Sequence, residues 1–266
     1  MKIGVFDSGF GGLTVLRALL RQIPGADYAY LGDTARLPYG AKSRATVARY
    51  AASSARFLVE EEAAEFLVIA CNTASALALD AIREAVAVPV LGVVETGAVA
   101  ADASSTTRDV LVIATAATVE SHAYAAECAA RGMRAIEKAC PLLVPLVEEG
   151  WTQHPVTEEV VRIYMGELMD QAGNAGMHAD TLVLACTHYP LLRETIERAV
   201  PRGVRVIDSA EVTAQQVQER LGSDGASTGE TQVEFFATDS VTKFRDLGTR
   251  FLGQEIPGVR LVDLGG

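Results

Sequence analysis

Residues 182–192 read LVLACTHYPLL, and residues 67–77 read LVIACNTASAL. Each segment begins with an apolar run typical of a buried strand and continues through a cysteine and two polar residues into a helix-like stretch. Five of the eleven positions are identical in the two segments. The repeat indicates that one strand–cysteine–helix unit occurs twice in the chain. We expect the sulfur atoms of Cys71 and Cys186 to reach one cleft from opposite sides.

Short apolar strands alternate with helical patterns on both sides of these segments, with long helices expected over residues 42–64 and 118–131. Such alternation predicts a parallel sheet covered by helices on both faces. The pattern restarts near residue 98. We therefore predict an α/β protein of two similar domains. Each has a mostly parallel sheet flanked by helices, the two are related by a pseudo-twofold internal duplication, and the active site lies in the cleft between them.

The tail after Asp208 has no counterpart in the middle of the chain, so it is assigned to the first half. It contains a helix, a Gly/Ser/Asp-rich loop after Leu221, and the strand-like run VEFFA. The predicted domains are residues 1–97 with 208–266, and residues 98–207. Because ligands bind beyond the carboxyl ends of parallel strands, the polar motifs at these ends are the candidate site.

Composition limits the protein's class and its partners. The chain has 266 residues, a formal net charge of −11 and 49 % apolar residues. This length can bury a full core, and the negative charge argues against nucleic-acid or anionic-membrane partners. The N-terminus shows no signal-peptide pattern, and no apolar run could span a membrane. We expect a cytoplasmic protein with reduced thiols, and a homodimer because symmetric dimers are the commonest association.

The two repeated cysteines have alternative explanations. A single cysteine after an apolar run is more often part of the core. The repetition favours a reactive role, since polar neighbours and a helix N-terminus stabilise a thiolate. A reducing compartment disfavours a disulfide between them, and no spacing supplies the further ligands that a zinc site needs. Cys128 and Cys140 lie in or beside ordinary helix-like sequence and are assigned to the core.

A glycine-rich turn follows the first strand, where residues 7–12 read DSGFGG. Backbone amides in such a turn can receive an anion, although the pattern is neither a dinucleotide-binding nor a Walker motif. A turn that merely requires small residues explains the glycines equally well. Asp7, at the end of a strand that faces a cleft, is better explained as a proton-handling or cation-pairing group.

Two thiols that face one carbon can invert a stereocentre. One removes the α-proton while the other delivers a proton to the opposite face, provided that each is tuned near the working pH. Asp7 beside one thiol and His188 beside the other would do this tuning. The carboxylate of an amino-acid substrate needs preorganised donors, for which the candidates are Ser8, Asn72, Thr73, Thr115, Thr118 and Thr187. None of the four lysines lies in a polar motif at a strand end, which favours chemistry without pyridoxal phosphate.

The chain resembles the bacterial glutamate racemases. It contains FDSGFGGLTVL, YLGDTARLPYG, VIACNTASA, VVETGA, LVLACTHYPLL and VIDSAE in the order found in that family, and the resemblance covers essentially the whole chain. It implies interconversion of L- and D-glutamate without cofactor or metal, which supplies D-glutamate for peptidoglycan and hence cell shape. An aspartate racemase or another amino-acid racemase of the same family is the alternative.

The resemblance also implies roles for individual residues. Cys71 acts on the D-enantiomer and Cys186 on the L-enantiomer, assisted by Asp7, His188 and Glu148, with Glu149 as the alternative to Glu148. Substrate contacts are implied for Asp7, Ser8, Pro38, Tyr39, Gly40, Cys71, Asn72, Thr73, Thr115, Thr118, Thr187 and His188. The family often has Gly-Thr where this chain has Ala114-Thr115. The chain lacks the N-terminal extension of a precursor-activated subgroup, so no such activation is expected.

Two other classes of function compete with the racemase. Asp7 beside a glycine-rich turn could accept a phosphoryl group in a Mg²⁺-dependent hydrolase, although no second acidic residue lies near it and the cysteine repeat has no role there. Loss of activity with EDTA, restored by Mg²⁺, would favour that hydrolase. A protein that only binds an amino acid would show binding without exchange of the α-proton.

Overall fold

The computed structural model of the protein describes residues 1–222 and 231–265. The chain divides into two compact units, Met1–Val93 with Ala210–Gly266 (unit 1) and Val94–Ser209 (unit 2). The predicted domain boundaries, after residues 97 and 207, stay a prediction. The Gly/Ser/Asp-rich loop expected after Leu221 falls at residues 223–230, outside the described residues.

Unit 1 contains a six-stranded sheet in the order β10-β9-β2-β1-β3-β4, in which every neighbouring pair is parallel. β1 lies in its interior, where Ile3, Val5 and Phe6 are fully buried. Burial on both faces explains why the strands read as continuous apolar runs. The strands are β1 (Lys2–Asp7), β2 (Asp27–Gly32), β3 (Phe66–Ile69), β4 (Val90–Gly92), β9 (Val233–Ala237) and β10 (Arg260–Leu261).

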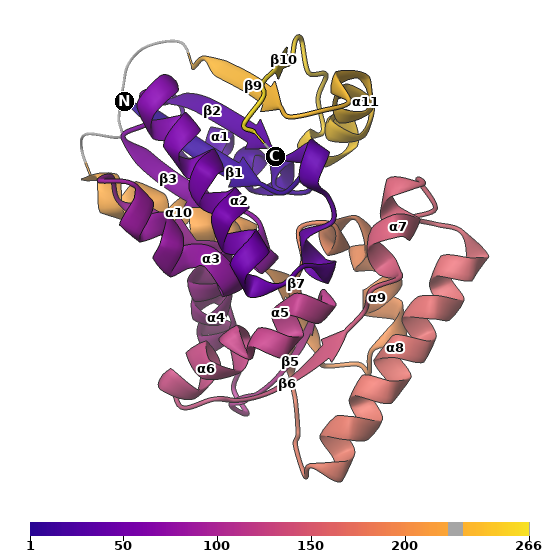
Figure 1. The fold of residues 1–266 in the computed structure, drawn as a ribbon. Helices are drawn as coiled ribbons and strands as arrows, with labels where there is room; N and C mark the ends of the chain where they lie inside the picture. The colour runs from indigo at the N-terminus through magenta and orange to yellow at the C-terminus, as the bar shows by residue number, and fades with distance from the viewer. Residues whose placement is uncertain (223–230, 266) are drawn as a thin grey trace. The chain divides into compact units, whose positions relative to one another are not determined.

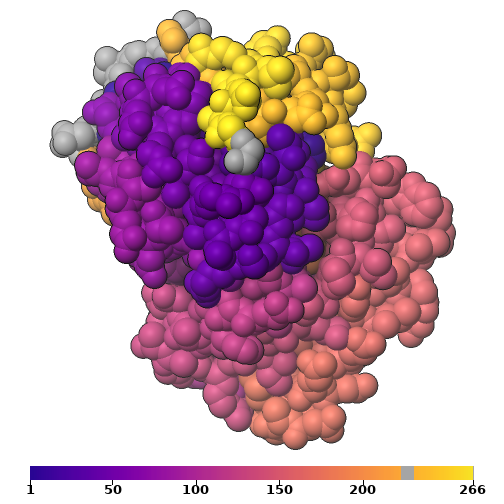
Figure 2. Space-filling view, viewed as in Figure 1, coloured from indigo at the N-terminus to yellow at the C-terminus, as the bar shows by residue number. Residues whose placement is uncertain are grey.

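The C-terminal part of the chain extends the sheet that the N-terminal part begins. β9 pairs with β2 in a parallel register that places Phe235 opposite Tyr30. In Figures 1 and 2 the yellow C-terminal segment accordingly lies against the indigo N-terminal strands and helices of the same unit. The carboxyl ends of β1, β2 and β9 therefore meet at one edge of this sheet.

Helices cover both faces of the sheet in unit 1 (Figure 1). α2 packs on α3, whereas α1 packs on α10 and α11. Because connections between parallel strands are right-handed, the helix between β1 and β2 must lie on the face opposite α2 and α3. These helices are α1 (Leu13–Gln22), α2 (Arg44–Arg56), α3 (Asn72–Ala85), α10 (Ala210–Leu221) and α11 (Val241–Leu252), with short turns η1 (Thr34–Arg36) and η2 (Tyr39–Ala41) after β2.

Unit 2 contains a four-stranded sheet in the order β6-β5-β7-β8, again with every neighbouring pair parallel. The strands are β5 (Asp109–Ala114), β6 (Arg134–Ala139), β7 (Thr181–Ala185) and β8 (Arg205–Asp208). The helices are α4 (Val93–Ser104), α5 (Ala116–Ser121), α6 (Ala123–Ala130), α7 (Leu143–Glu148), α8 (Pro155–Asn174), the short turn η4 (Tyr189–Leu192) and α9 (Arg193–Ala199).

The two sheets share one strand order. Numbered along the chain within each unit, β2-β1-β3-β4 and β6-β5-β7-β8 both read 2-1-3-4. Cys71 follows the third strand of unit 1, and Cys186 follows the third strand of unit 2. The predicted class, an α/β protein with two parallel sheets flanked by helices, is confirmed. A common strand order is what a duplication predicts, whereas the symmetry relation and the shared cleft stay predictions.

Two predicted helices differ from the structure. The helix expected over residues 42–64 ends at Arg56, and the chain continues in a wider turn, η3 (Phe57–Glu61), in which the Glu62 N–H bonds to the Phe57 carbonyl. The helix expected over residues 118–131 is divided into α5 and α6 at His122, which has a left-handed φ of 54°. Among the described residues, no helix is both long and apolar enough to cross a lipid bilayer.

Candidate active site

The first cluster of candidate residues lies at the carboxyl ends of β1 and β3 in unit 1. Cys71 follows β3 and caps the N-terminus of α3, where its sulfur accepts the Ala74 N–H at 3.4 Å. The thiol lies 3.4 Å from the Ser8 hydroxyl oxygen. β1 ends at Asp7 and pairs directly with β3, so the adjacent strands bring the DSG and CNT motifs together.

The charge state of Cys71 follows from its surroundings. The residue is 5 % exposed. Burial, followed by the nearby Asp7 carboxylate, raises the pKa of the thiol to about 12, although hydrogen bonds from Ser8 and Ala74 oppose this shift. Asp7 is itself 1 % exposed, and one of its oxygens accepts the Gly9 N–H at 2.8 Å. At neutral pH, Cys71 is therefore a protonated thiol and can serve as an acid.

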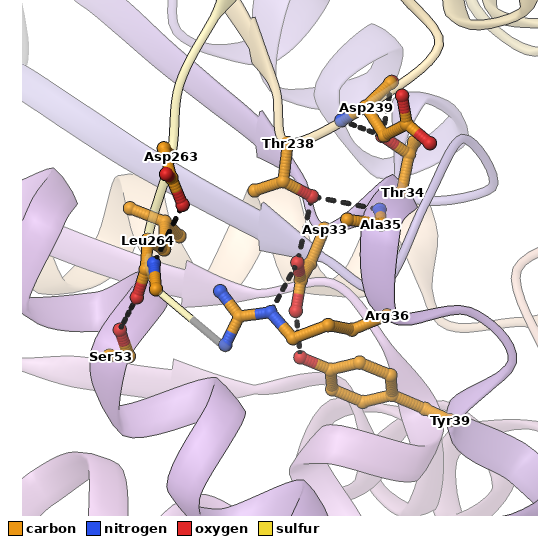
Figure 3. A network of polar contacts seen from close by, with 11 residues as sticks. Asp33, Thr34, Ala35, Arg36, Tyr39, Ser53, Thr238, Asp239, Asp263 and Leu264 are labelled. Atoms are coloured by element: carbon orange, nitrogen blue, oxygen red, sulfur yellow. Dashed lines mark hydrogen bonds and ion pairs between the residues drawn. The ribbon is translucent and has the colours of Figure 1, made fainter.

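The loop after β2 supplies the next group of sequence-predicted residues. Pro38 is exposed and Gly40 is partly exposed, but the Tyr39 ring is buried. The Tyr39 hydroxyl donates to Asp33 at 2.5 Å (Figure 3). Burial and this carboxylate raise the pKa of Tyr39, so it stays a neutral donor. The proton of this hydroxyl is therefore engaged by Asp33, and contacts of Pro38, Tyr39 and Gly40 with a substrate stay predictions.

Asn72 and Thr73 form the first turn of α3 and are both buried. Their position next to Cys71 at a helix N-terminus is suited to holding a carboxylate, because the first N–H groups of a helix point outward along its axis. Direct contact with a substrate stays a prediction for both residues.

The second cluster lies in unit 2, after β7. Cys186 and His188 are buried, and His188 Nε2 lies 3.3 Å from Glu148 Oε1 at the end of α7. Burial by itself lowers the pKa of His188, but its interactions with Cys186 and Glu148, hydrogen bonds foremost, raise it to about 10. His188 is therefore an imidazolium at neutral pH. Glu149, the alternative to Glu148, is exposed.

Three threonines complete the candidates in unit 2. Thr115 follows β5 and is partly exposed, whereas Thr118 is fully buried with its hydroxyl 3.0 Å from that of Thr115. Thr187 Oγ1 lies 3.5 Å from His188 Nδ1. Thr118 thus supports Thr115 in this conformation, and contacts of the three hydroxyls with a substrate stay predictions.

Sequence reasoning did not single out three residues that hold these clusters in place. Tyr30 is fully buried and donates to the Gly9 carbonyl at 3.2 Å, which fixes the DSGFGG turn. Tyr189 donates to the carbonyls of Ala114 and Cys140, at 3.1 and 3.0 Å, and so joins the ends of β5 and β6. Asp33 lies within the quoted YLGDTARLPYG motif. No local pattern distinguishes these residues from ordinary core or loop residues.

The described residues contain no group of three or more His, Cys, Asp or Glu side chains arranged to hold a metal ion. The thiols of the two clusters are also unbridged, as are Cys128 and Cys140. The cysteine, histidine and carboxylate groups that these clusters bring together are types of side chain that can accept and donate protons.

Most of the chain matches a known protein family. The family model described as Asp/Glu/Hydantoin racemase matches residues 3–217. The chain belongs to this racemase family. A glutamate racemase of Koribacter versatilis is 52 % identical over 288 residues, which cover 99 % of this chain and 98 % of that protein.

Solved racemase structures share the fold. The crystal structure of glutamate racemase from Francisella tularensis in complex with D-glutamate has a TM-score of 0.90 and 36 % identity, covering 99 % of this chain and 97 % of that one. Glutamate racemase from Thermus thermophilus in complex with β-chloro-D-alanine has a TM-score of 0.87 and 43 % identity, with the same coverage. Both cysteine clusters lie within the residues that the racemase family model matches, whereas β9 and α11 lie beyond them.

Proposed function

We propose that this protein is a glutamate racemase, an isomerase that interconverts L- and D-glutamate by removing and returning the α-proton. The observation that carries the proposal is a buried cysteine after the third strand of each of two sheets with the same strand order, in a chain of the Asp/Glu/Hydantoin racemase family. A relative named glutamate racemase, 52 % identical over nearly the whole chain, supports glutamate over aspartate as substrate.

The two cysteines have different neighbours, Asp7 beside Cys71 and His188 beside Cys186, and this difference suits a two-base mechanism. The cationic His188 favours a thiolate at Cys186, which removes the α-proton of L-glutamate and becomes a thiol. The Cys71 thiol delivers its proton to the opposite face and becomes a thiolate, so that one proton is taken up and one is released. The reverse sequence converts D-glutamate to L-glutamate. In this mechanism Asp7 assists Cys71. Glu148 pairs with His188, which assists Cys186.

We further propose that the enzyme needs no cofactor, acts in the cytoplasm and forms a homodimer. The reaction uses neither pyridoxal phosphate nor a metal, because the two thiols perform both proton transfers. It takes place in the cytoplasm, where thiols stay reduced, and supplies D-glutamate for peptidoglycan and cell shape. The protein is a homodimer, which sedimentation equilibrium would test.

The decisive experiment follows each glutamate enantiomer in D₂O by circular dichroism and NMR. The wild type should racemise both enantiomers, with solvent deuterium appearing at the α-carbon of the product. Cys71→Ser and Cys186→Ser should each lose overall turnover by about 10³-fold or more, since removing one member of a catalytic unit costs most of its rate. Cys128→Ser is the matched control, because Cys128 is a buried thiol of α6 outside both clusters.

Several results would contradict the proposal. Near-wild-type racemisation by both serine variants would show that the thiols are not the two bases. Binding of glutamate without exchange of the α-proton would indicate a binding protein, and activity that EDTA abolishes and Mg²⁺ restores would indicate the hydrolase. Racemisation of aspartate in preference to glutamate would correct the substrate.

A further inference from the structure

Asp33 is a buried carboxylate on which three side chains converge. It is 0 % exposed and follows β2 directly. Its Oδ1 accepts Arg36 Nε at 3.0 Å and the Thr238 hydroxyl at 2.9 Å, and its Oδ2 accepts the Tyr39 hydroxyl at 2.5 Å (Figure 3). A buried carboxylate is tolerated when a cation and further donors satisfy it, as Arg36 and the two hydroxyls do here.

The Asp33 contacts connect the candidate substrate loop to the distant C-terminal strand. Thr238 follows β9, and its hydroxyl also accepts the Ala35 N–H at 2.9 Å. The next residue is bound as well, because the Thr34 hydroxyl donates to the Asp239 carbonyl at 2.5 Å and accepts the Asp239 N–H at 2.9 Å. Residues 238–239 thus clamp residues 33–35 at the carboxyl edge of the sheet, as Figure 3 shows.

The loop side of this arrangement is packed as well as hydrogen-bonded. The Arg36 guanidinium lies 4.6 Å from the centre of the Tyr50 ring on α2, and the Tyr39 ring lies 6.2 Å from both Tyr50 and Phe6. The turn that contains Tyr39, η2 (Tyr39–Ala41), contacts α3, the helix whose N-terminus Cys71 caps. Asp33 therefore holds the tyrosine of a turn that packs on the helix capped by Cys71.

We propose that Asp33 is a positioning residue for the racemase reaction and that the C-terminal segment acts through it. Thr238 fixes the Asp33 carboxylate, Asp33 fixes Tyr39, and Tyr39 holds the backbone of residues 38–40 against the bound amino acid beside Cys71. This inference rests on the proposed function. Thr238 lies beyond residues 3–217, so the segment that orients this loop is supplied from outside the part of the chain that the family model matches.

The Thr238 hydroxyl allows a sharp test. Thr238→Val keeps the shape of the side chain but removes the hydroxyl that serves both Asp33 and Ala35, whereas Thr238→Ser keeps that hydroxyl and loses a methyl group. Loss of ground-state positioning should raise KM for both enantiomers about tenfold in Thr238→Val, with kcat within about threefold of wild type. Thr238→Ser should restore KM to within about twofold of wild type, since its hydrogen bonds can still form.

Two further variants locate the effect. Thr249→Val is the matched control, because the Thr249 hydroxyl donates to the Arg245 carbonyl at 2.9 Å within α11 and does not touch the loop. It should leave KM unchanged. Tyr39→Phe removes only the other hydroxyl on Asp33. If both hydroxyls act through one carboxylate, the effects of Thr238→Val and Tyr39→Phe on KM should be non-additive in the double variant. Asp33→Asn would change the carboxylate directly. If that variant does not fold, the variants of Thr238 and Tyr39 still test the positioning role.

Hydrogen exchange of the peptide containing residues 33–41 gives a readout that needs no catalysis. Its amides should exchange faster in Thr238→Val than in wild type or Thr249→Val. Unchanged exchange would overturn the clamp, whether or not the wild type racemises glutamate. A wild type that does not racemise refutes the proposed function alone. With an active wild type, an unchanged KM in Thr238→Val, a loss confined to kcat, or a Thr238→Ser variant as impaired as Thr238→Val would each overturn the positioning role.

Discussion

His188 and Glu148 form a close pair in unit 2, with His188 Nε2 3.3 Å from Glu148 Oε1. The histidine follows β7 and the glutamate ends α7, so the fold brings together two residues that are 40 positions apart in the sequence. The neighbouring Glu149 is exposed and lines an apolar hollow of about 260 Å³ with Trp151 and Val156. Of the two glutamates that the sequence left open, the geometry therefore favours Glu148 as the partner of His188.

Substitution of these glutamates should separate their roles. Glu148→Gln removes the negative charge that helps to keep His188 protonated, and kcat/KM should fall about tenfold or more. The enantiomers have equal free energy in water, so the fall must be the same in both directions. Glu149→Gln should stay within about twofold of wild type. Circular dichroism of both reactions measures this, and equal losses in the two variants would contradict the assignment.

The charge of His188 predicts a pH dependence of stability. Its folded-state pKa of about 10 lies above the ordinary histidine value of 6.5, so its stabilising contribution is fully present below pH 6.5 and is lost as the pH rises through 10. In this window the free energy of unfolding should decline by up to about 1.4 kcal/mol per pH unit from this residue. Urea unfolding at several pH values should show a shallower decline for His188→Gln. Parallel curves for wild type and variant would refute the prediction.

Gly12 packs against Asp7 and Ala70 at a distance that leaves no room for a side chain. A Cβ at Gly12 would lie 2.6 Å from Asp7 Cβ and 2.8 Å from Ala70 Cβ, both nearer than carbon atoms can approach. Gly12→Ala should therefore destabilise the protein by about 1–3 kcal/mol and displace Asp7 from Cys71, which lowers kcat/KM.

Gly166 provides the control for this substitution. It is exposed in the middle of α8, and a Cβ there would meet nothing within 4 Å. Gly166→Ala should stabilise the protein by about 0.5–1 kcal/mol through its higher helix propensity, without a change in activity. Thermal unfolding and kinetics of the two variants test both expectations, and a wild-type-like Gly12→Ala would show that the approach is not restrictive.

Asp180 should contribute to stability in unit 2 through the loop that follows α4. It accepts hydrogen bonds from Ser105 Oγ at 2.7 Å, from Thr106 N at 2.7 Å and from Thr107 N at 3.1 Å. Burial opposes its ionisation, but these bonds lower its pKa well below the usual value. The stabilisation is therefore present above pH 3.8, the ordinary pKa of an aspartate, and is lost as the pH falls toward the folded-state pKa.

Asp180→Asn should lower the free energy of unfolding by about 1 kcal/mol at neutral pH and flatten its dependence on pH below about 4. Asp170→Asn, at an exposed position of α8, is the control and should change neither quantity appreciably. Chemical unfolding between pH 2 and 7 measures the difference. Identical slopes for wild type and Asp180→Asn would contradict the proposed source of stability.

Local sequence patterns predicted the elements that bury an apolar stripe or run. The repeat around Cys71 and Cys186, and the strand that ends at Asp7, appear in the structure where the sequence placed them. They are predictable because the burial of each element requires a regular apolar spacing that can be read along the chain. The two-residue strand β10 and the break at His122 carry no such spacing, and the sequence did not reveal them.

The sequence by itself determined the α/β class, the repeated strand–cysteine–helix unit and the pair of thiols suited to proton transfer. The tertiary structure decided which glutamate meets His188 and that Thr118 is buried. It also decided that Asp33 binds both Tyr39 and Thr238, the latter 205 positions further along the chain than Asp33. A periodic pattern records only whether each residue faces the core or the solvent. The partner that a polar side chain meets there depends on how distant strands pair, and only the folded chain specifies that pairing.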